Sequence, residues 1–340
     1  ALPISVDAAQ IEAAARVLAA GEPAALILGF RALTEPATLR RAGAIAARTG
    51  ARLLAPTANP RIERGGGLPE VARIPYPVAQ ARDALADLRA AVLVETAEPV
   101  AFFAYPDQPS RVLPEGAAVH ALARPGQCGV EAIARLAERL GADEAEAPAR
   151  TVERPAIPTA GEITPEGLAQ VVAALLPEDA VVVDESVSAG RGFAAATAAA
   201  PRHSWLALTG GAIGVGPPLA AGAAIGAPGR KVLALQADGS ALYTLQALWT
   251  QAREGLDVTT VILANRGYRI LQDELMRVGA NPGRTALDML ELAEPVVDFV
   301  GLARALGVSA ARAEDAPALA DAVGRGLATP GPALVEAVLP

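Results

Sequence analysis

Two apolar segments, each followed by a polar residue with an oxygen that can bind a cation, constrain the fold of this chain most. Residues 231–237 and 258–264 have the composition of buried strands, and residues 241–254 between them predict a helix. A strand–helix–strand unit closes into two parallel strands through a right-handed crossover. Asp238 and Asn265 therefore end side by side at the edge where α/β sheets bind ligands. One carboxylate and one amide oxygen suit Mg²⁺ when a phosphate supplies further ligands.

The predicted helix carries Leu242, Leu245, Leu248 and Trp249 on one face, as a core-facing helix would. A purely structural interpretation stays open for the polar pair, because Asp favours helix N-caps and Asn favours turns.

The chain alternates strand and helix patterns over most of its length. In the first half, strands are predicted at 23–29, 51–55, 90–95 and 117–122, with helices at 38–49 and 78–89. In the second half, strands at 180–184 and 333–339 accompany the two already named. The expected fold class is α/β, with two Rossmann-like domains whose parallel sheets are flanked by helices.

The predicted domains are residues 1–141 and 163–340. Residues 142–162 are acidic and rich in proline, which is typical of a linker. The motif Gly29-Phe30-Arg31 is not a G-x-G-x-x-G fingerprint, so nucleotide binding by the first domain has little support.

Composition excludes several classes of function. The net charge is −8 with no basic block, which argues against a nucleic-acid partner. The single cysteine, Cys128, excludes disulfides within the chain and any metal site with several cysteines. No apolar stretch of about 18 residues is present, so we expect no membrane partner and a cytoplasmic location.

The second half resembles the diphosphate-binding domain of thiamine diphosphate (ThDP) enzymes. That family has a Gly-Asp-Gly motif, a spacer of a little under thirty residues, and Asn-Asn; this chain has Ala237-Asp238-Gly239 and Ala264-Asn265. The likeness is greatest to benzoylformate decarboxylase and the acetolactate synthase group, through residues 238–250. The first half is similar to the family's central domain.

The resemblance implies roles for individual residues and the cofactors ThDP and Mg²⁺. Asp238, Asn265 and the Gly267 carbonyl match metal ligands, and Ile213 matches an apolar residue beneath the bent cofactor. The remaining matches are to cofactor-contacting positions: Glu185, Ser188, Gly210, Gly211, Gly239, Ser240 and Tyr268. Phe103 and Leu271 match positions at the substrate pocket.

The resemblance also implies a missing component. Family members carry an N-terminal pyrimidine-binding domain whose glutamate bonds the aminopyrimidine ring, and nothing before Ala1 supplies it. We therefore expect no catalytic residue in this chain, and a pyrimidine-binding domain of the same or another chain as partner, in a homodimer or tetramer.

The expected function is a ThDP- and Mg²⁺-dependent decarboxylase or carboligase that acts on a small 2-oxo acid. Two alternatives stay open. The chain could be a truncated or separately encoded subunit that binds ThDP and Mg²⁺ without activity of its own. It could also be a FAD- or nucleotide-binding module.

Overall fold

The computed structural model describes residues 3–340, and the chain divides into two compact units between Thr151 and Val152. That division falls inside the segment 142–162, which the sequence predicts to be a linker. Its first part belongs to the first unit, where Arg150 exchanges backbone hydrogen bonds with Gly67 and Leu68.

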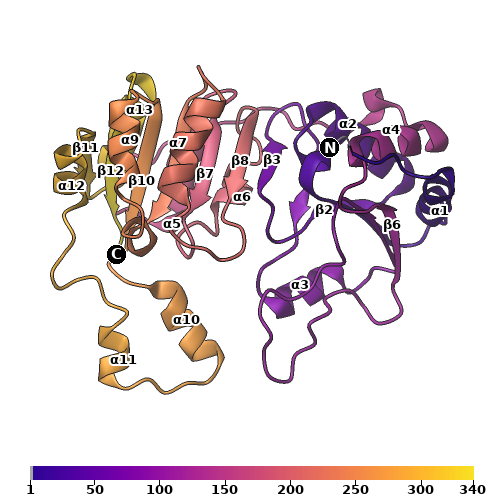
Figure 1. Cartoon of the computed structure of the whole chain (residues 1–340), viewed down its shortest axis with the longest axis horizontal. Helices are drawn as coiled ribbons and strands as arrows, with labels where there is room; N and C mark the ends of the chain where they lie inside the picture. The colour runs from indigo at the N-terminus through magenta and orange to yellow at the C-terminus, as the bar shows by residue number, and fades with distance from the viewer. Residues whose placement is uncertain (1–2) are drawn as a thin grey trace. The chain divides into compact units, whose positions relative to one another are not determined.

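The first unit is a parallel sheet covered by helices (Figure 1). Its strand order is β4-β2-β1-β5-β6. The strands of the sheet are β1 (Ala24–Leu28), β2 (Arg52–Ala55), β4 (Ala72–Arg73), β5 (Ala90–Val94) and β6 (Ala118–Ala123). A further strand of the unit, β3 (Arg61–Arg64), lies outside this sheet. The helices are α1 (Ala8–Leu18), α2 (Pro36–Thr49), α3 (Val78–Leu85) and α4 (Gly129–Leu140), with 3₁₀ turns η1 (Phe30–Leu33) and η2 (Glu144–Glu146).

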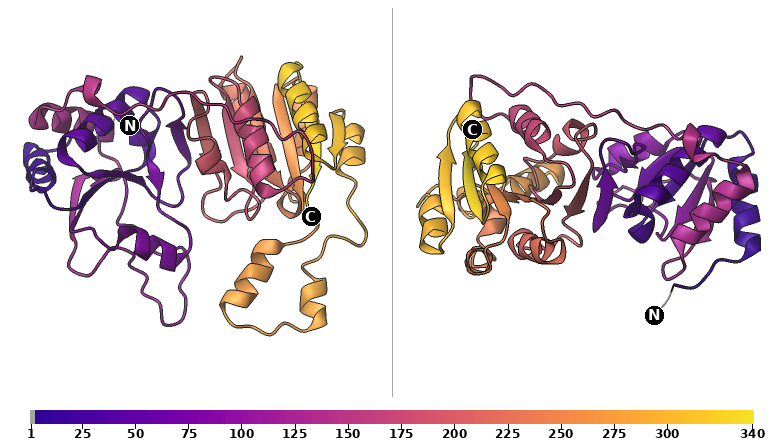
Figure 2. Two further views of the ribbon diagram at one scale, coloured as in Figure 1. Left: turned by 180° about the vertical axis from the view of Figure 1, so that it is seen from behind. Right: turned by 90° about the horizontal axis from the view of Figure 1, so that it is seen from above.

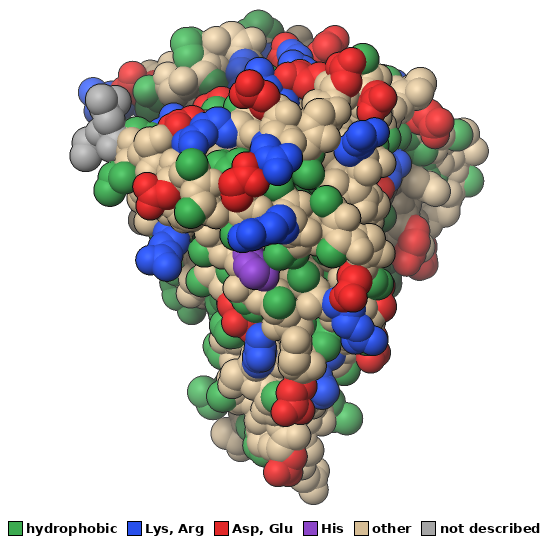
Figure 3. All heavy atoms as spheres, turned by 90° about the vertical axis from the view of Figure 1, so that its right-hand side faces the viewer, with side chains coloured by type: hydrophobic (Ala, Val, Ile, Leu, Met, Phe, Trp, Pro, Cys, Tyr) green, Lys and Arg blue, Asp and Glu red, His purple; other side chains and the backbone are tan. Residues whose placement is uncertain are grey.

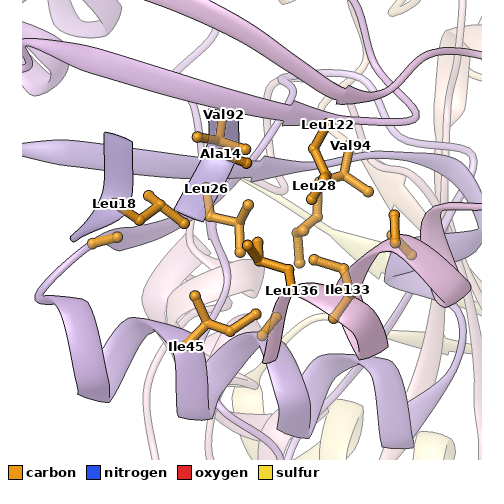
Figure 4. Close-up of a cluster of buried hydrophobic side chains, with 14 of the residues drawn as sticks. Ala14, Leu18, Leu26, Leu28, Ile45, Val92, Val94, Leu122, Ile133 and Leu136 are labelled. Carbon is orange, nitrogen blue, oxygen red and sulfur yellow. The ribbon is translucent and has the colours of Figure 1, made fainter. Parts of the chain in front are cut away.

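The core of the first unit lies between the sheet and α1, α2 and α4 (Figure 4). Leu26, Leu28 and Val92 project from the strands onto Ile45 of α2 and Leu136 of α4. On the side that carries α1 and α4, acidic and basic side chains are interspersed, with no block of one sign (Figure 3).

The second unit is also a parallel sheet, with the order β11-β12-β10-β9-β7-β8. The strands are β7 (Val181–Glu185), β8 (His203–Ala207), β9 (Val232–Ala237), β10 (Val258–Ala264), β11 (Ser309–Ala313) and β12 (Ala333–Val338). The helices are α5 (Pro165–Leu175), α6 (Phe193–Ala196), α7 (Gly216–Gly226), α8 (Asp238–Ala241), α9 (Ala247–Arg253), α10 (Arg269–Arg277), α11 (Arg284–Asp288), α12 (Phe299–Ala305) and α13 (Ala316–Ala328).

Helices cover both faces of this second sheet. α7, α9 and α12 pack on one face, and α5 and α13 pack on the other, which Figure 2 shows from behind. α10 and α11 extend away from the sheet and bury none of their residues (Figure 1). The predicted α/β class with two Rossmann-like units is confirmed.

The helix predicted at 241–254 is wrong in one respect, because it is interrupted. α8 ends at Ala241, turns occupy residues 242–246, and α9 begins at Ala247. In the turns, the Thr244 hydroxyl donates a hydrogen bond to the Gly214 carbonyl at 2.6 Å. The interruption changes the helical phase, so Leu245 and Leu248 are buried while Leu242 and Trp249 are exposed.

No helix in the described part of the chain, residues 3–340, is long and apolar enough to cross a membrane.

Candidate metal centre

Asp238 and Asn265 lie at the same edge of the second sheet, as the sequence predicts. β9 and β10 are adjacent and parallel, with Ala237 in register with Leu263, so the two strands end together. The backbone N–H of Arg266 donates a hydrogen bond to Asp238 Oδ2 at 2.7 Å. The loop that follows one strand is therefore tied directly to the carboxylate that follows the other.

The Asp238 carboxylate is buried, with 3% of the residue exposed, and retains capacity for a further partner. Its Oδ1 accepts the Gly239 N–H at 2.8 Å, and its Oδ2 accepts the Arg266 N–H. Burial raises the pKa of Asp238, whereas these backbone hydrogen bonds lower it. A carboxylate has about four lone-pair positions, so a cation can be added, and its charge would favour the ionised form.

The Gly267 carbonyl faces away from the segment that pairs with its loop. Leu292 N–H donates to Arg266 O, and Tyr268 N–H donates to Leu290 O, which pairs this loop with residues 290–292. In such an antiparallel pairing the polar groups of the intervening residue face away from the partner segment. The Gly267 N–H accordingly donates to Asn265 Oδ1 at 3.1 Å, and the Gly267 carbonyl is directed away from residues 290–292.

The oxygens of Asp238, Asn265 and Gly267 fit a hard cation whose remaining ligands come from another molecule. Carboxylate, amide and carbonyl oxygens are the donors that Mg²⁺ prefers. Among residues 3–340, no group of three or more His, Cys, Asp or Glu side chains could hold a metal alone. A cation at Asp238 and Asn265 would therefore need oxygens from another source, such as a diphosphate.

Gly239 and Ser240 form the first turn of α8 and are both buried. A Cβ atom on Gly239 would lie 2.6 Å from Cε1 of Tyr268, so the aromatic ring packs directly on this glycine. The Ser240 hydroxyl lies 2.7 Å from the Gln236 amide, whose nitrogen, correctly oriented, faces the Glu185 carboxylate at 3.2 Å. The structure thus brings Tyr268 and Ser240 into the same region as Asp238 and Asn265.

Glu185 ends β7 and is almost fully buried, with 1% of the residue exposed. Its carboxylate accepts the backbone N–H groups of Gly214 and Gly216. Burial raises the pKa of Glu185, and the hydrogen bonds from Gly216 and Gly214 oppose that rise. The observed contacts of Glu185 are with Gln236 and with the glycine-rich loop, residues 209–216. Its contact with a diphosphate stays a prediction.

The glycine-rich loop has a shape that only glycine permits at several positions. Gly210 and Gly211 adopt φ angles of +67° and +70°. A Cβ atom on Gly216 would lie 1.9 Å from the Gln236 side-chain amide. Ile213 lies between these points with 37% of the residue exposed, so its side chain is available at the surface of the loop. Ser188 follows Glu185 in a half-buried turn.

The two predicted substrate-pocket residues lie in different units. Leu271 is on α10 and is 47% exposed, and Phe103 is in the first unit and is 52% exposed. Their assignment to one pocket stays a prediction.

Sequence reasoning missed two buried polar residues near the metal ligands, Gln236 and Glu336. Both are lone polar residues within otherwise apolar strands, and that pattern could have found them. Burial raises the pKa of Glu336; Arg312 and Arg266 oppose this, whereas Asp298 and Asp238 add to it.

Comparisons with known proteins show which family the chain resembles. Residues 187–337 match the family described as thiamine pyrophosphate enzyme, C-terminal TPP binding domain. The whole chain is 47% identical to a putative acetolactate synthase large subunit, IlvX, of Mycobacterium tuberculosis, and spans 66% of its length. About half of the chain, 52%, is 34% identical to benzoylformate decarboxylase of Pseudomonas aeruginosa and covers 32% of that protein.

Solved structures show the same fold. A thiamine diphosphate-dependent 4-hydroxybenzoylformate decarboxylase of Rhodococcus jostii superposes with a TM-score of 0.80 at 24% identity. The superposition covers 99% of this chain and 65% of that one. A putative thiamin diphosphate-dependent enzyme of Mycobacterium smegmatis superposes with a TM-score of 0.75 at 25% identity, over 100% of this chain and 66% of that one.

Proposed function

Because the chain belongs to the thiamine diphosphate-dependent enzyme family, we propose that its second unit holds the Mg²⁺ and diphosphate end of that cofactor. Asp238, the Asn265 side chain and the Gly267 carbonyl would bind Mg²⁺. The observation that carries the proposal is the hydrogen bond from the Arg266 N–H to Asp238, which ties the loop 265–267 to this carboxylate at one sheet edge. The diphosphate would complete the shell of the cation.

The neighbouring residues would orient the cofactor. Gly239 and Ser240 at the start of α8 would face the diphosphate, beside the half-buried Ser188. Gly210, Gly211 and the exposed Ile213 would face its rings, and Tyr268 would line the same region. Glu185 would keep the loop in place by binding Gly214 and Gly216.

For the reaction, we propose decarboxylation or carboligation of a small 2-oxo acid. The relatives named as acetolactate synthase and benzoylformate decarboxylase support this class. When bound, ThDP would supply the electron sink that allows a 2-oxo acid to lose CO₂. The chain's own residues would anchor and orient the cofactor, with Phe103 and Leu271 near the substrate.

We propose that a pyrimidine-binding domain, from the same protein or another chain, supplies the acid–base residue and completes a dimer or tetramer. The support is that the chain spans 66% of the length of its M. tuberculosis relative. Binding of ThDP and Mg²⁺ without turnover by the chain alone would agree with this arrangement.

Calorimetric titration of ThDP in the presence and absence of Mg²⁺ tests the site. We expect binding that depends on Mg²⁺ and that Asp238→Ala abolishes. Asp179→Ala is the matched control, because Asp179 precedes β7 at the opposite edge of the sheet and pairs with Arg202. Equal binding by the wild type and Asp238→Ala would contradict the metal assignment. Turnover of pyruvate or benzoylformate by the chain alone would contradict the proposal that another domain supplies the acid–base residue.

A further inference from the structure

Glu336 is a buried carboxylate in the middle of an apolar strand. It lies on β12 in register with Ile262 of β10, which is in turn in register with Gln236 of β9. The three side chains therefore share the sheet face that α9 and α12 cover. Only 2% of Glu336 is exposed. A charged side chain at such a position is costly to bury, so it needs partners.

In the part of the chain that the structure describes, only one of the two Glu336 carboxylate oxygens has a charged protein group near it. Glu336 Oε1 lies 3.7 Å from Nη2 of Arg312 on the neighbouring strand β11. Glu336 Oε2 has no hydrogen-bond partner among residues 3–340. Buried polar atoms in folded proteins nearly always have a partner, either a protein group or an internal water.

A narrow cavity connects Glu336 with the metal centre. Glu336, Asp238 and Arg266 all line it, and Val297 and Phe299 form part of its apolar wall. It has room for about one water molecule. A water molecule has two donor hydrogens, so it can donate one to each of two carboxylates.

We propose that Glu336 is a positioning residue for the metal ligand Asp238, acting through one water molecule bound in this cavity. The proposal rests on the proposed Mg²⁺ site. Asp238 is held by the Arg266 and Gly239 N–H groups, and the water would add a third contact from the interior of the protein. The lone pairs of Asp238 that remain would then be fixed toward the cation. Groups that orient metal ligands in this way typically change metal affinity by about 10–100-fold when they are removed.

The test compares the Mg²⁺ concentration that half-saturates ThDP binding in the wild type and three variants, measured by calorimetry. We expect Glu336→Leu to raise that concentration by roughly 10-fold or more. Glu336→Gln keeps an oxygen that can accept from the water, so it should restore most of the lost affinity. Thr260→Val is the matched control, because Thr260 has a buried unpaired hydroxyl on the same sheet face but does not line the cavity.

The outcomes separate this inference from the proposed function. Absence of Mg²⁺-dependent ThDP binding by the wild type would overturn both. If the wild type binds ThDP normally and Glu336→Leu has the same half-saturating Mg²⁺ concentration, only the role of Glu336 would be overturned. Equal losses of Mg²⁺ affinity in Glu336→Leu and Thr260→Val would also overturn it, because they would indicate a general effect of altering the core.

A crystal structure of the wild-type protein gives an independent check if Glu336→Leu fails to fold. We expect one water within hydrogen-bond distance of both Glu336 Oε2 and an Asp238 carboxylate oxygen. A protein side chain that fills the cavity instead would overturn the proposal.

Discussion

The two units each carry a buried glutamate at the point where the strand order of the sheet reverses, yet only one unit has a candidate site there. In the first unit the reversal lies between β1 and β5, and Glu95 follows β5. In the second it lies between β7 and β9, and Glu185 ends β7. Such points are where open α/β sheets bind ligands.

In the first unit, the glutamate itself occupies this position. The Glu95 carboxylate accepts the N–H of Ala32 in η1 at 3.0 Å and the N–H of Gly129 at the start of α4 at 2.8 Å. A Cβ atom on Gly129 would lie 2.7 Å from Glu95 Cδ, so the carboxylate fits closely against the helix. This position is where a nucleotide phosphate would bind a helix N-terminus, which disfavours the nucleotide-binding alternative.

In the second unit, the Glu185 carboxylate also accepts backbone N–H groups. Here, however, Asp238 and Asn265 follow β9 and β10, the next two strands in the sheet. Glu185 binds loop N–H groups, and the additional oxygens of Asp238, Asn265 and Gly267 remain for a cation. A carboxylate at a strand end is therefore weak support for a site. What matters is how many oxygens are left after the backbone N–H groups have been satisfied.

The largest expected effect comes from Glu185→Ala. It leaves the Gly214 and Gly216 N–H groups buried without an acceptor, which costs about 1–3 kcal/mol for each group. We expect the free energy of unfolding to fall by about 2–5 kcal/mol in urea denaturation, and ThDP affinity to fall with it because the loop loses its support. Unchanged ThDP affinity in a folded variant would show that Glu185 does not shape the site.

Glu95→Ala should destabilise the first unit without changing the cofactor site. The variant leaves the Ala32 and Gly129 N–H groups without an acceptor, so unfolding of the first unit should become easier by about 2–4 kcal/mol. The Mg²⁺-dependent affinity for ThDP should stay at the wild-type value. A fall in affinity as large as that of Glu185→Ala would break the comparison between the two units.

Gly239→Ala should weaken both folding and cofactor binding. The added Cβ would lie 2.6 Å from the Tyr268 ring, and displacing the ring costs about 1–3 kcal/mol. We expect the free energy of unfolding to fall by that amount. ThDP affinity, measured by calorimetry, should fall by up to roughly 150-fold because the displaced ring alters the cofactor site. Gly222→Ala on α7 is the control, because its Cβ would contact nothing within 4 Å and alanine favours helices. Equal affinities in the two variants would rule out a steric role for Gly239.

The smallest expected effect is on the pH dependence of stability. The pKa of Glu185 is raised above its ordinary value of 4.5 by burial, so the folded state binds this proton more tightly than the unfolded state. Stability from this group is fully present below pH 4.5 and is lost as the pH rises through the higher folded-state pKa. Glu185→Gln should flatten this decline in urea denaturation followed from pH 4 upward. An unchanged slope would show that another group causes the decline.

The sheets and the position of Asp238 beside Asn265 were predictable because they depend on local patterns. The strand at 258–264 is found with the same limits, since its apolar run has clear ends. Parallel pairing then brings the ends of neighbouring strands to one edge whatever the rest of the chain does.

Features that depend on contacts between distant segments could not be predicted. The interruption of the helix at residues 242–246 arises where Thr244 bonds Gly214, thirty residues earlier. Glu185 accepts N–H groups from the loop that contains Gly214. Glu95 accepts one N–H from Ala32, earlier in the chain, and one from Gly129, later in the chain. A periodicity in the sequence contains no information on such pairings.

Both methionines of the chain belong to the protruding segment: Met276 lies in α10, and Met289 directly follows α11. Met276 and Met289 are 74% and 76% exposed, and no other methionine is present. A sample labelled with ¹³C at methionine methyl groups would therefore give two NMR signals, and both would come from this one segment. The chain thus carries an intrinsic spectroscopic probe that reports on the segment after the metal-binding loop while all the rest of the protein stays silent.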